Sequence, residues 1–252
     1  MSLTKTPEQV NKMRISAALL AQCLDLMVAA SKPGQSGKDI DEIAEEFIRD
    51  HGAIPAFKDY GDPHNPFPGC ICFSRNAVVV HGIPRESDII EEGDIITIDC
   101  GLSLDGWFSD AARLFGVGEI SEDDRDIIVW SEKVLNAGIE ACLPGNKLGN
   151  ISNAIQTEVG RSPYYNVIQF GGHAIGQTMH EDPHVANAGP KHTLPILEPG
   201  MIFCLEPMLL KTKTPLVLLP DKWTVVTRDF SRATHIEHTV LITDTRPEIL
   251  TA

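Results

Sequence analysis

The feature that most constrains the fold is a unit of two helices followed by strands, whose signals occur twice along the chain. Pro33-Gly34 separates two amphipathic stretches near the N-terminus, and Pro144-Gly145 separates a second such pair 111 residues later. The same offset aligns the apolar stripes of the second helix in each pair, Ile40, Ala44 and Ile48 with Ile151, Ile155 and Val159. Common helix signals can also align by chance, so the strands provide a second test.

Helix start and stop signals predict four helices. Polar residues suited to helix N-termini precede each of the first three, and Pro or Gly follows their apolar stripes. The predicted limits are Thr6 to Pro33, Ser36 to Gly52, Ser121 to Leu143, and a short segment at about 151–159.

An apolar strand that ends in a carboxylate repeats in the same way. Segments 93–99 (Gly-Asp-Ile-Ile-Thr-Ile-Asp) and 200–206 (Gly-Met-Ile-Phe-Cys-Leu-Glu) each place an acidic residue six positions after a glycine. Because helices, strands and carboxylates agree, the sequence predicts one α+β domain over residues 1–252. Its pseudo-symmetric halves would cover about 6–116 and 121–243.

Two aspartates are predicted to lie side by side on a hairpin. Asp99 follows a strand so apolar that both of its faces should be buried, and a buried carboxylate needs a cation, a metal or several donors. Asp105-Gly106 is a strong two-residue turn signal that would pair Gly101 with Asp110. Asp99 and Asp110 would then be diagonal neighbours on one face, about 7–8 Å apart at their backbones.

Further polar side chains occur where apolar residues are expected. Glu206 and Glu237 lie in or next to apolar strands, and His173 lies in the small-residue segment 171–176. A salt bridge or a strand end could explain each carboxylate alone, and a core histidine could explain His173. Four carboxylates and one imidazole together predict a site for two divalent ions, with Mn, Co, Fe or Zn as suitable metals.

Charge and cysteine usage limit the cellular setting. The net charge of −14 without a Lys/Arg run argues against direct binding to nucleic acid or anionic membranes. No signal peptide and no run of about 18 apolar residues is found, so no membrane span is expected. The six cysteines form no Cys-x-x-Cys pair, which is typical of reduced thiols and a cytoplasmic protein.

From Thr6 to Thr243 the sequence resembles the methionine aminopeptidases. Each motif is weak alone, but their order and spacing are specific to that family. The matching segments are 76–84, 93–99, Ser109-Asp110, 172–176, 180–183, 206–208 and Trp223 to Thr239. The resemblance implies the pita-bread fold, a pseudo-two-fold duplication of helix-helix-strand units around a curved antiparallel sheet.

The resemblance also implies the site and its chemistry. Removal of the N-terminal methionine from nascent proteins and peptides with a small second residue is implied, by hydroxide activated between two metal ions. Glu206 would act as general base and then acid. His81 and His180 would be catalytic and would bind the substrate peptide. The implied metal ligands are Asp99, Asp110, His173, Glu206 and Glu237.

The type and setting of the enzyme follow from the same resemblance. Only 32 residues separate His173 from Glu206, which leaves no room for the helical insertion of type II enzymes and indicates a short, bacterial-like type I form. Nascent polypeptide N-termini would be the substrate of a cytoplasmic monomer, and a transient contact with the ribosome is left open.

Three positions depart from the family pattern and put the pocket shape in question. Ala174 replaces a glycine, Met179 replaces an aromatic residue and Phe57 replaces a cysteine. The candidate substrate-pocket wall is Tyr60, Phe67, Cys72, Met179 and Trp223, although core aromatics and a buried thiol are an equal alternative for each. Two other functions therefore remain in view: a pita-bread aminopeptidase of different specificity, and a non-catalytic binding protein on the same fold.

Overall fold

Four helices and fifteen short or medium strands make up residues 3–252 of the computed structural model, which are the residues described. The helices are α1 (Pro7–Ala30), α2 (Gly37–Asp50), α3 (Glu122–Glu140) and α4 (Leu148–Val159). The strands of the first half are β1 (Ile54–Pro55), β2 (Ile71–Arg75), β3 (Val78–Val80), β4 (Ile95–Leu104) and β5 (Trp107–Gly116). Those after α4 are β6 (Tyr165–Asn166), β7 (Gly171–Ala174), β8 (Glu181–Ala186), β9 (Ile202–Leu205), β10 (Met208–Leu210), β11 (Leu216–Leu218), β12 (Val225–Thr227), β13 (Ala233–His235), β14 (His238–Leu241) and β15 (Glu248–Ile249).

The helices begin where their capping residues predict. The Thr6 hydroxyl accepts from the amide of Gln9, whose side chain accepts from the amide of Thr6, and Ser36 and Asp39 repeat this reciprocal arrangement before α2. The predicted C-terminus of α3 is wrong by three residues. After Glu140 the chain leaves the α-helical pattern and forms a tighter turn, in which the amide of Leu143 donates to the carbonyl of Ala141.

The strands pair only antiparallel, as predicted, but they do not form one continuous sheet. β1, β2 and β5 join β4 in one sheet, and β15, β14, β9, β7 and β8 form a second; two three-stranded sheets complete the set. Register shifts at Val225/Val226 and His173/Ala174 interrupt the ladders. A bridge between Ala112 and Glu237, with backbone hydrogen bonds of 3.2 and 3.3 Å, connects β5 to the segment between β13 and β14.

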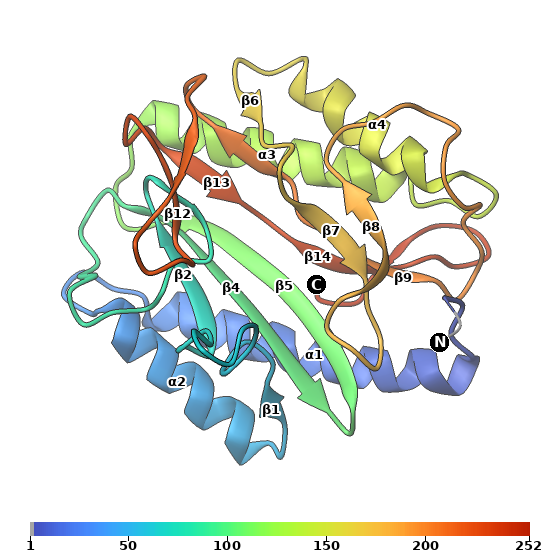
Figure 1. Ribbon diagram of the computed structural model, residues 1–252, viewed down its shortest axis with the longest axis horizontal. Coiled ribbons are helices and arrows are strands. Elements are labelled where there is room, and N and C mark those ends of the chain that lie inside the picture. Colours follow the sequence, from blue (N-terminus) through green and yellow to red (C-terminus); the bar gives the residue numbers. More distant parts are fainter. Residues whose placement is uncertain (1–2) are drawn as a thin grey trace.

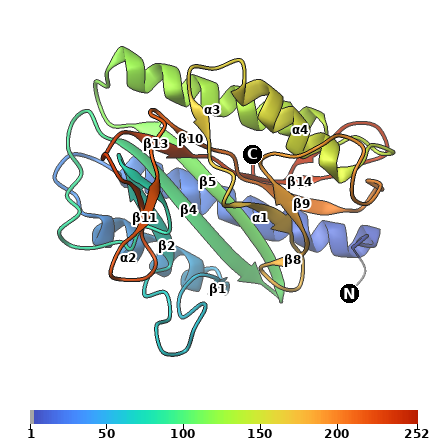
Figure 2. The same ribbon diagram turned by 45° about the horizontal axis from the view of Figure 1, so that its top comes forward.

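The two helix pairs lie on opposite sides of the strands, with α1 and α2 at one side of Figure 1 and α3 and α4 at the other. The turned view in Figure 2 keeps α3 and α4 together and away from α2. One buried cluster joins α1 and α2 to β2 and β4, and another joins α3 and α4 to β9 and β14. Each helix pair therefore buries its apolar stripe against its own strands, which confirms the α+β class.

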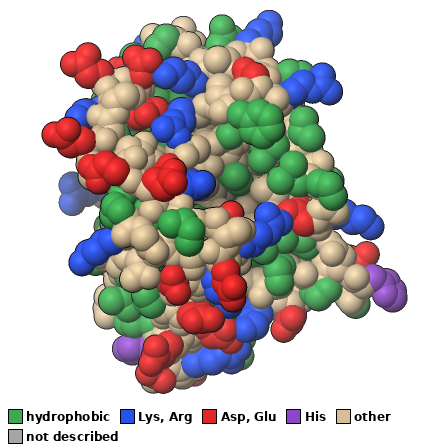
Figure 3. Space-filling view, turned by 90° about the vertical axis from the view of Figure 1, so that its left-hand side faces the viewer, with side chains coloured by type: hydrophobic (Ala, Val, Ile, Leu, Met, Phe, Trp, Pro, Cys, Tyr) green, Lys and Arg blue, Asp and Glu red, His purple; other side chains and the backbone are tan. Residues whose placement is uncertain are grey.

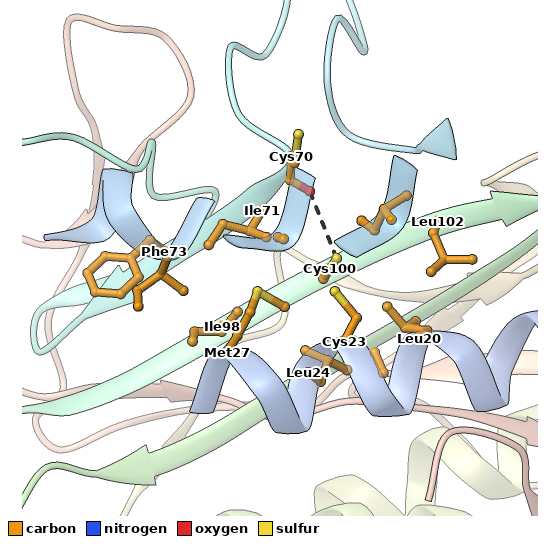
Figure 4. Packing of buried hydrophobic residues seen from close by; sticks show 14 of the residues in the cluster. Leu20, Cys23, Leu24, Met27, Cys70, Ile71, Phe73, Ile98, Cys100 and Leu102 are labelled. Atoms are coloured by element: carbon orange, nitrogen blue, oxygen red, sulfur yellow. Dashed lines mark hydrogen bonds between the residues drawn. The ribbon is translucent and has the colours of Figure 1, made fainter. Parts of the chain in front are cut away.

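Helix α1 is a core element although it is long and apolar enough to cross a membrane by length and composition. Cys23 and Met27 of this helix face Ile98 and Cys100 of β4 in Figure 4. Half of the apolar stretch of α1 is buried within the protein. Its apolar character therefore has an explanation in packing against β4, whose inner side chains are fully enclosed.

The β4–β5 hairpin forms in the predicted register. Gly101 lies opposite Asp110 and Asp99 opposite Ala112, with Asp105-Gly106 at the turn. The prediction that Asp99 ends its strand is wrong, because β4 continues to Leu104. The strand continues because β2 and β5 pair with the residues on both sides of Asp99, so the carboxylate projects from the middle of a sheet.

Candidate metal centre and substrate cavity

Two aspartates project from the β4–β5 hairpin into the interior. Asp99 and Asp110 are 7% and 4% exposed. Asp110 is fixed by Thr239 of β14, whose hydroxyl donates to the Asp110 carbonyl at 2.6 Å. Strands from both halves of the chain therefore set the position of this carboxylate.

The second half contributes the other predicted ligands to the same place. Glu237 is 2% exposed and lies at the backbone bridge to Ala112, and Glu206 follows directly after β9. His173 of β7 lies with Nε2 3.5 Å from Oδ2 of Asp110, while its Nδ1 is 3.0 Å from the Ala174 carbonyl. A carbonyl only accepts, so Nδ1 carries the proton and the Nε2 lone pair faces the carboxylates.

The ligand atoms gather in two groups that share one residue. One potential ligand atom from each of Asp110, His173, Cys204 and Glu237 lies within 4.8 Å of the others, and the same holds for Asp99, His235 and Glu237. A carboxylate common to two groups is the arrangement that bridges two nearby ions.

The electrostatics of these carboxylates favour either bound protons or a cation. Burial raises the pKa of Asp110 to about 8, and burial followed by repulsion from Asp110 raises the pKa of Asp99, Glu206 and Glu237 well above the usual range. One carboxylate oxygen each of Asp99, Asp110 and Glu237 is buried without a hydrogen-bond partner. Divalent ions would satisfy these oxygens and neutralise the mutual repulsion, so the residues fit a metal centre.

His235 is a site residue that sequence reasoning missed. Its Nε2 lies 3.7 Å from Glu206 Oε2 and 3.9 Å from Glu237 Oε2, and it has no hydrogen-bond partner. Thr97 fixes its backbone by donating to the His235 carbonyl at 2.8 Å. Burial lowers the pKa of His235 to about 3, which keeps the ring neutral. The sequence does contain a signal for this role, because His235 lies two positions before the predicted ligand Glu237 and residues two apart on an extended chain face the same side.

Cys204 is also close to the carboxylates and was not predicted. Its Sγ lies 3.5 Å from the Thr239 hydroxyl. Burial, and then the nearby Glu237 and Asp110, raise the pKa of this thiol well above its usual range. Because the thiolate is the metal-binding form, Cys204 is a neutral neighbour of the centre.

A cavity of about 230 Å³ opens next to the carboxylates. It is lined by the five predicted ligands, by His81 and His180, and by the wall residues Phe57, Tyr60, Phe67, Cys72 and Trp223. Burial lowers the pKa of both His81 and His180 to about 4, and each is lowered further by a neighbouring histidine. Both rings are therefore neutral near pH 7 and can each donate one N–H.

Aromatic contacts hold the cavity wall. Phe67 and Trp223 meet edge to face with ring centroids 5.3 Å apart, and Trp223 Nε1 donates to the Asn65 carbonyl at 3.0 Å. Met179 is not among the residues that line the cavity, unlike the predicted wall. Met179 is buried, and its side chain packs against Gly101 beside Phe57. The two side chains fill the space next to this glycine, where a Cβ would lie 2.7 Å from Met179 Cε and 2.9 Å from the Phe57 ring.

Comparison with known proteins adds sequence and fold relatives. Residues 11–244 match the model of metallopeptidase family M24. The chain is 42% identical to methionine aminopeptidase 1 of Bacillus subtilis, over 100% of this chain and 99% of that protein. It is 43% identical to methionine aminopeptidase 1 of Mycobacterium tuberculosis, over 96% and 92%.

Solved structures agree with the sequence relatives. The methionine aminopeptidase of Rickettsia prowazekii superposes with a TM-score of 0.94 at 36% identity, covering 99% of both chains. A prolidase from Pyrococcus furiosus shares the fold at a TM-score of 0.77 and 19% identity, covering 99% of this chain and 65% of that one. The pita-bread prediction is thereby confirmed. With two helix pairs enclosing strands that converge on buried acids and histidines, the chain belongs to the methionine aminopeptidases of metallopeptidase family M24.

Proposed function

We propose that this methionine aminopeptidase holds two divalent ions and removes methionine from polypeptides whose second residue is small. The observation that carries the proposal is the pair of ligand groups sharing Glu237, placed at the end of a cavity with an aromatic wall. A single-ion site would need no shared carboxylate, and a structural site would need no adjoining cavity.

The residues that would hold the ions divide around Glu237. Asp110 and His173 would bind on one side, and Asp99 with His235 or Glu206 on the other. Mn, Co, Fe and Zn all suit a set of oxygen ligands with imidazole nitrogen. When bound, the ions would polarise the scissile carbonyl and lower the pKa of the attacking water.

The remaining chemistry belongs to the protein side chains. Glu206 lies at the junction of the carboxylates and the cavity, where its carboxylate can take a proton from water and deliver it to the leaving amine. His81 and His180 are neutral and face the same cavity, so their N–H groups can stabilise the oxyanion that develops on the scissile carbonyl.

The shape of the cavity supports selection of methionine. Its wall combines flat aromatic surfaces from Tyr60, Phe67 and Trp223 with the Cys72 thiol and the Phe57 ring. An unbranched thioether side chain fits a narrow apolar space of this kind and makes favourable contacts with aromatic edges. The two histidines at the cavity mouth would crowd a large second residue.

Cleavage of a Met-Ala-Ser peptide together with metal analysis tests the proposal. We expect methionine release by protein carrying about two ions per chain, loss of activity in EDTA, and recovery with Mn, Co or Fe. Binding of the peptide without release would favour a non-catalytic binding protein. Best turnover of Xaa-Pro peptides, or indifference to the first residue, would favour an aminopeptidase of other specificity.

The proposed setting is the cytoplasm, where the enzyme would act as a monomer on nascent chains with at most transient ribosome contact. All six cysteines are buried free thiols, which suits a reducing compartment. On the face in Figure 3, Lys and Arg side chains are interspersed with Asp and Glu, which suits a protein that does not bind nucleic acid directly.

A further inference from the structure

The turn that carries His180 is closed by the next residue in the chain. Oε1 of Glu181 accepts from the amide of Gln177 at 3.0 Å and from the amide of Thr178 at 3.5 Å. This turn connects β7, which carries His173, to β8. The carboxylate of Glu181 therefore fixes the backbone from which the His180 ring projects into the cavity.

Lys5 holds that carboxylate from the opposite end of the chain. Its Nζ lies 2.7 Å from Oε2 of Glu181, and the two side chains are only 5% and 11% exposed. The backbone of Lys5 is itself fixed, because its amide donates to the Gly200 carbonyl at 2.9 Å. An ion pair this deeply buried is costly to break, since the remaining partner loses its counter-charge without regaining water.

The sequence leaves space for this ion pair at Gly176. A Cβ on that residue would lie 2.6 Å from Glu181 Oε1 and 2.7 Å from Lys5 Nζ, so the two paired side chains would have to move to accommodate it. The amide of Phe108 also donates to the Gly176 carbonyl at 2.8 Å, so β5 fixes the start of the turn. The turn is thus held by contacts from two distant parts of the chain, Lys5 and β5.

The His180 ring has a contact of its own on the cavity side. Its Nδ1 lies 2.6 Å from the hydroxyl of Tyr60, with ring centroids 5.3 Å apart. A tyrosine hydroxyl that stays protonated can donate to Nδ1, and the proton of the neutral imidazole then resides on Nε2. Nε2–H is the donor that a developing oxyanion would need.

We propose that Lys5 and Tyr60 are positioning residues for His180, Lys5 through the Glu181 carboxylate and Tyr60 through the ring nitrogen. Lys5 sets where the ring is, and Tyr60 sets which nitrogen carries the proton. The inference rests on the proposed function, in which His180 donates to the reacting carbonyl.

A double-mutant cycle with His180→Ala tests the role of Lys5. Lys5→Met should lower kcat/KM for Met-Ala-Ser by roughly 10- to 100-fold, because a catalytic group displaced by about 1 Å loses that much. In the His180→Ala background the same substitution should cost less than about twofold, because the group it positions is gone. Equal losses in both backgrounds, or no loss in either, would overturn the role.

Arg14→Met is the matched control. Arg14 also makes a close ion pair near the N-terminus, at 2.8 and 2.7 Å to Glu248, but neither residue contacts the His180 turn. We expect kcat/KM of this variant within about twofold of wild type, because an exposed pair contributes little. Metal content and melting temperature are measured for every variant, and a fall of kcat/KM in Arg14→Met equal to that in Lys5→Met would refute specific positioning.

Tyr60→Phe tests the ring contact by a signal independent of activity. In ¹⁵N-histidine NMR of the diamagnetic Zn²⁺-loaded protein, His180 should show Nε2 protonated, with its signals assigned by their absence in His180→Ala. Tyr60→Phe should mix the two tautomers and lower kcat/KM about three- to tenfold, the net worth of one hydrogen bond. A proton on Nδ1 in the wild type, or an unchanged tautomer in the variant, would overturn this role of Tyr60.

The two proposals fail in different ways. If the wild-type, metal-loaded protein released no methionine, the proposed function would fall while the NMR result on Tyr60 and His180 could still be read. If methionine is released but the cycle is additive, only the positioning role is refuted.

Discussion

Removing the metal ions should make the stability of this protein fall as the pH rises above neutrality. In the metal-free protein, burial raises the pKa of Asp110 to about 8 and raises those of Asp99, Glu206 and Glu237 well above normal. These groups keep protons in the folded state that the unfolded chain has already released above about pH 5. Each retained proton therefore makes folding less favourable with every unit of increasing pH.

The histidines set the lower pH limit for measuring this effect. Burial lowers the pKa of His81 and His180 to about 4 and that of His235 to about 3. Their contribution to stability grows as the pH rises towards the unfolded value of about 6.5 and is constant above it. Below about pH 8 most cysteine thiols of the unfolded chain, with a usual pKa of about 8.5, are still protonated and add only a smaller loss of stability in the same direction, so the informative window is pH 7 to 8.

The magnitude follows from the number of protons. One proton held across one pH unit changes the free energy of unfolding by about 1.4 kcal/mol. Asp110 alone, half-titrated at about pH 8, gives a loss of about 1 kcal/mol between pH 7 and 8, and the raised pKa values of Asp99, Glu206 and Glu237 act in the same direction. For a chain of this size, 1 kcal/mol corresponds to about 2–4 °C, so the melting temperature should fall by at least that amount.

Thermal unfolding of the EDTA-treated protein, followed by circular dichroism at pH 7.0, 7.5 and 8.0, measures the slope. Asp110→Asn is the control, since an amide cannot titrate and the slope should flatten by about one proton. Adding Mn²⁺ should abolish or reverse the dependence, because ions bind the ionised carboxylates. A metal-free protein whose melting temperature is constant or rises over this window would refute the assignment of proton-holding buried acids.

Single substitutions test the other assignments. Glu206→Gln should keep the fold and lower turnover by at least about 10²-fold, and near-normal turnover would remove Glu206 from the proton path. His235→Ala should weaken metal binding by about 10- to 100-fold in a chelator competition; unchanged affinity would make it a bystander. His81→Ala should reduce turnover with metal content intact, whereas loss of metal would identify His81 as a ligand. Phe57→Cys should enlarge the cavity and change the ratio of Met-Ala-Ser to Leu-Ala-Ser turnover by about 10-fold or more, and an unchanged ratio would exclude Phe57 from selectivity.

The hairpin and the helix starts could be predicted because their causes are local. Asp105-Gly106 determines the turn, and period-two pairing then fixes Gly101 opposite Asp110 without any knowledge of the rest of the chain. Thr6 and Ser36 likewise cap their helices through residues three positions later. Local chemistry of this kind is fully contained in a few consecutive residues.

The features that were missed depend on contacts between distant segments. His235 becomes a site residue only because Thr97, far earlier in the chain, fixes its backbone beside the carboxylates. Met179 was predicted for the pocket wall, but it is not among the residues that line the cavity. Its side chain packs against Gly101, where the absence of a side chain leaves room for it. The interruption of the sheet at His173/Ala174 has no counterpart in the alternation of apolar residues.

The shared carboxylate at the bridge between the two halves has a consequence for the synthesis of the enzyme itself. Glu237 is held against Ala112 and belongs to both ligand groups, and it is translated later than the other predicted ligands, Asp99, Asp110, His173 and Glu206. Neither half contains a complete set of ligands, and ions that bind only the assembled centre stabilise only the finished chain. Both ligand groups can therefore be completed only after the segment that carries Glu237 has been made, and a product truncated before that segment would lack the shared ligand and remain inactive.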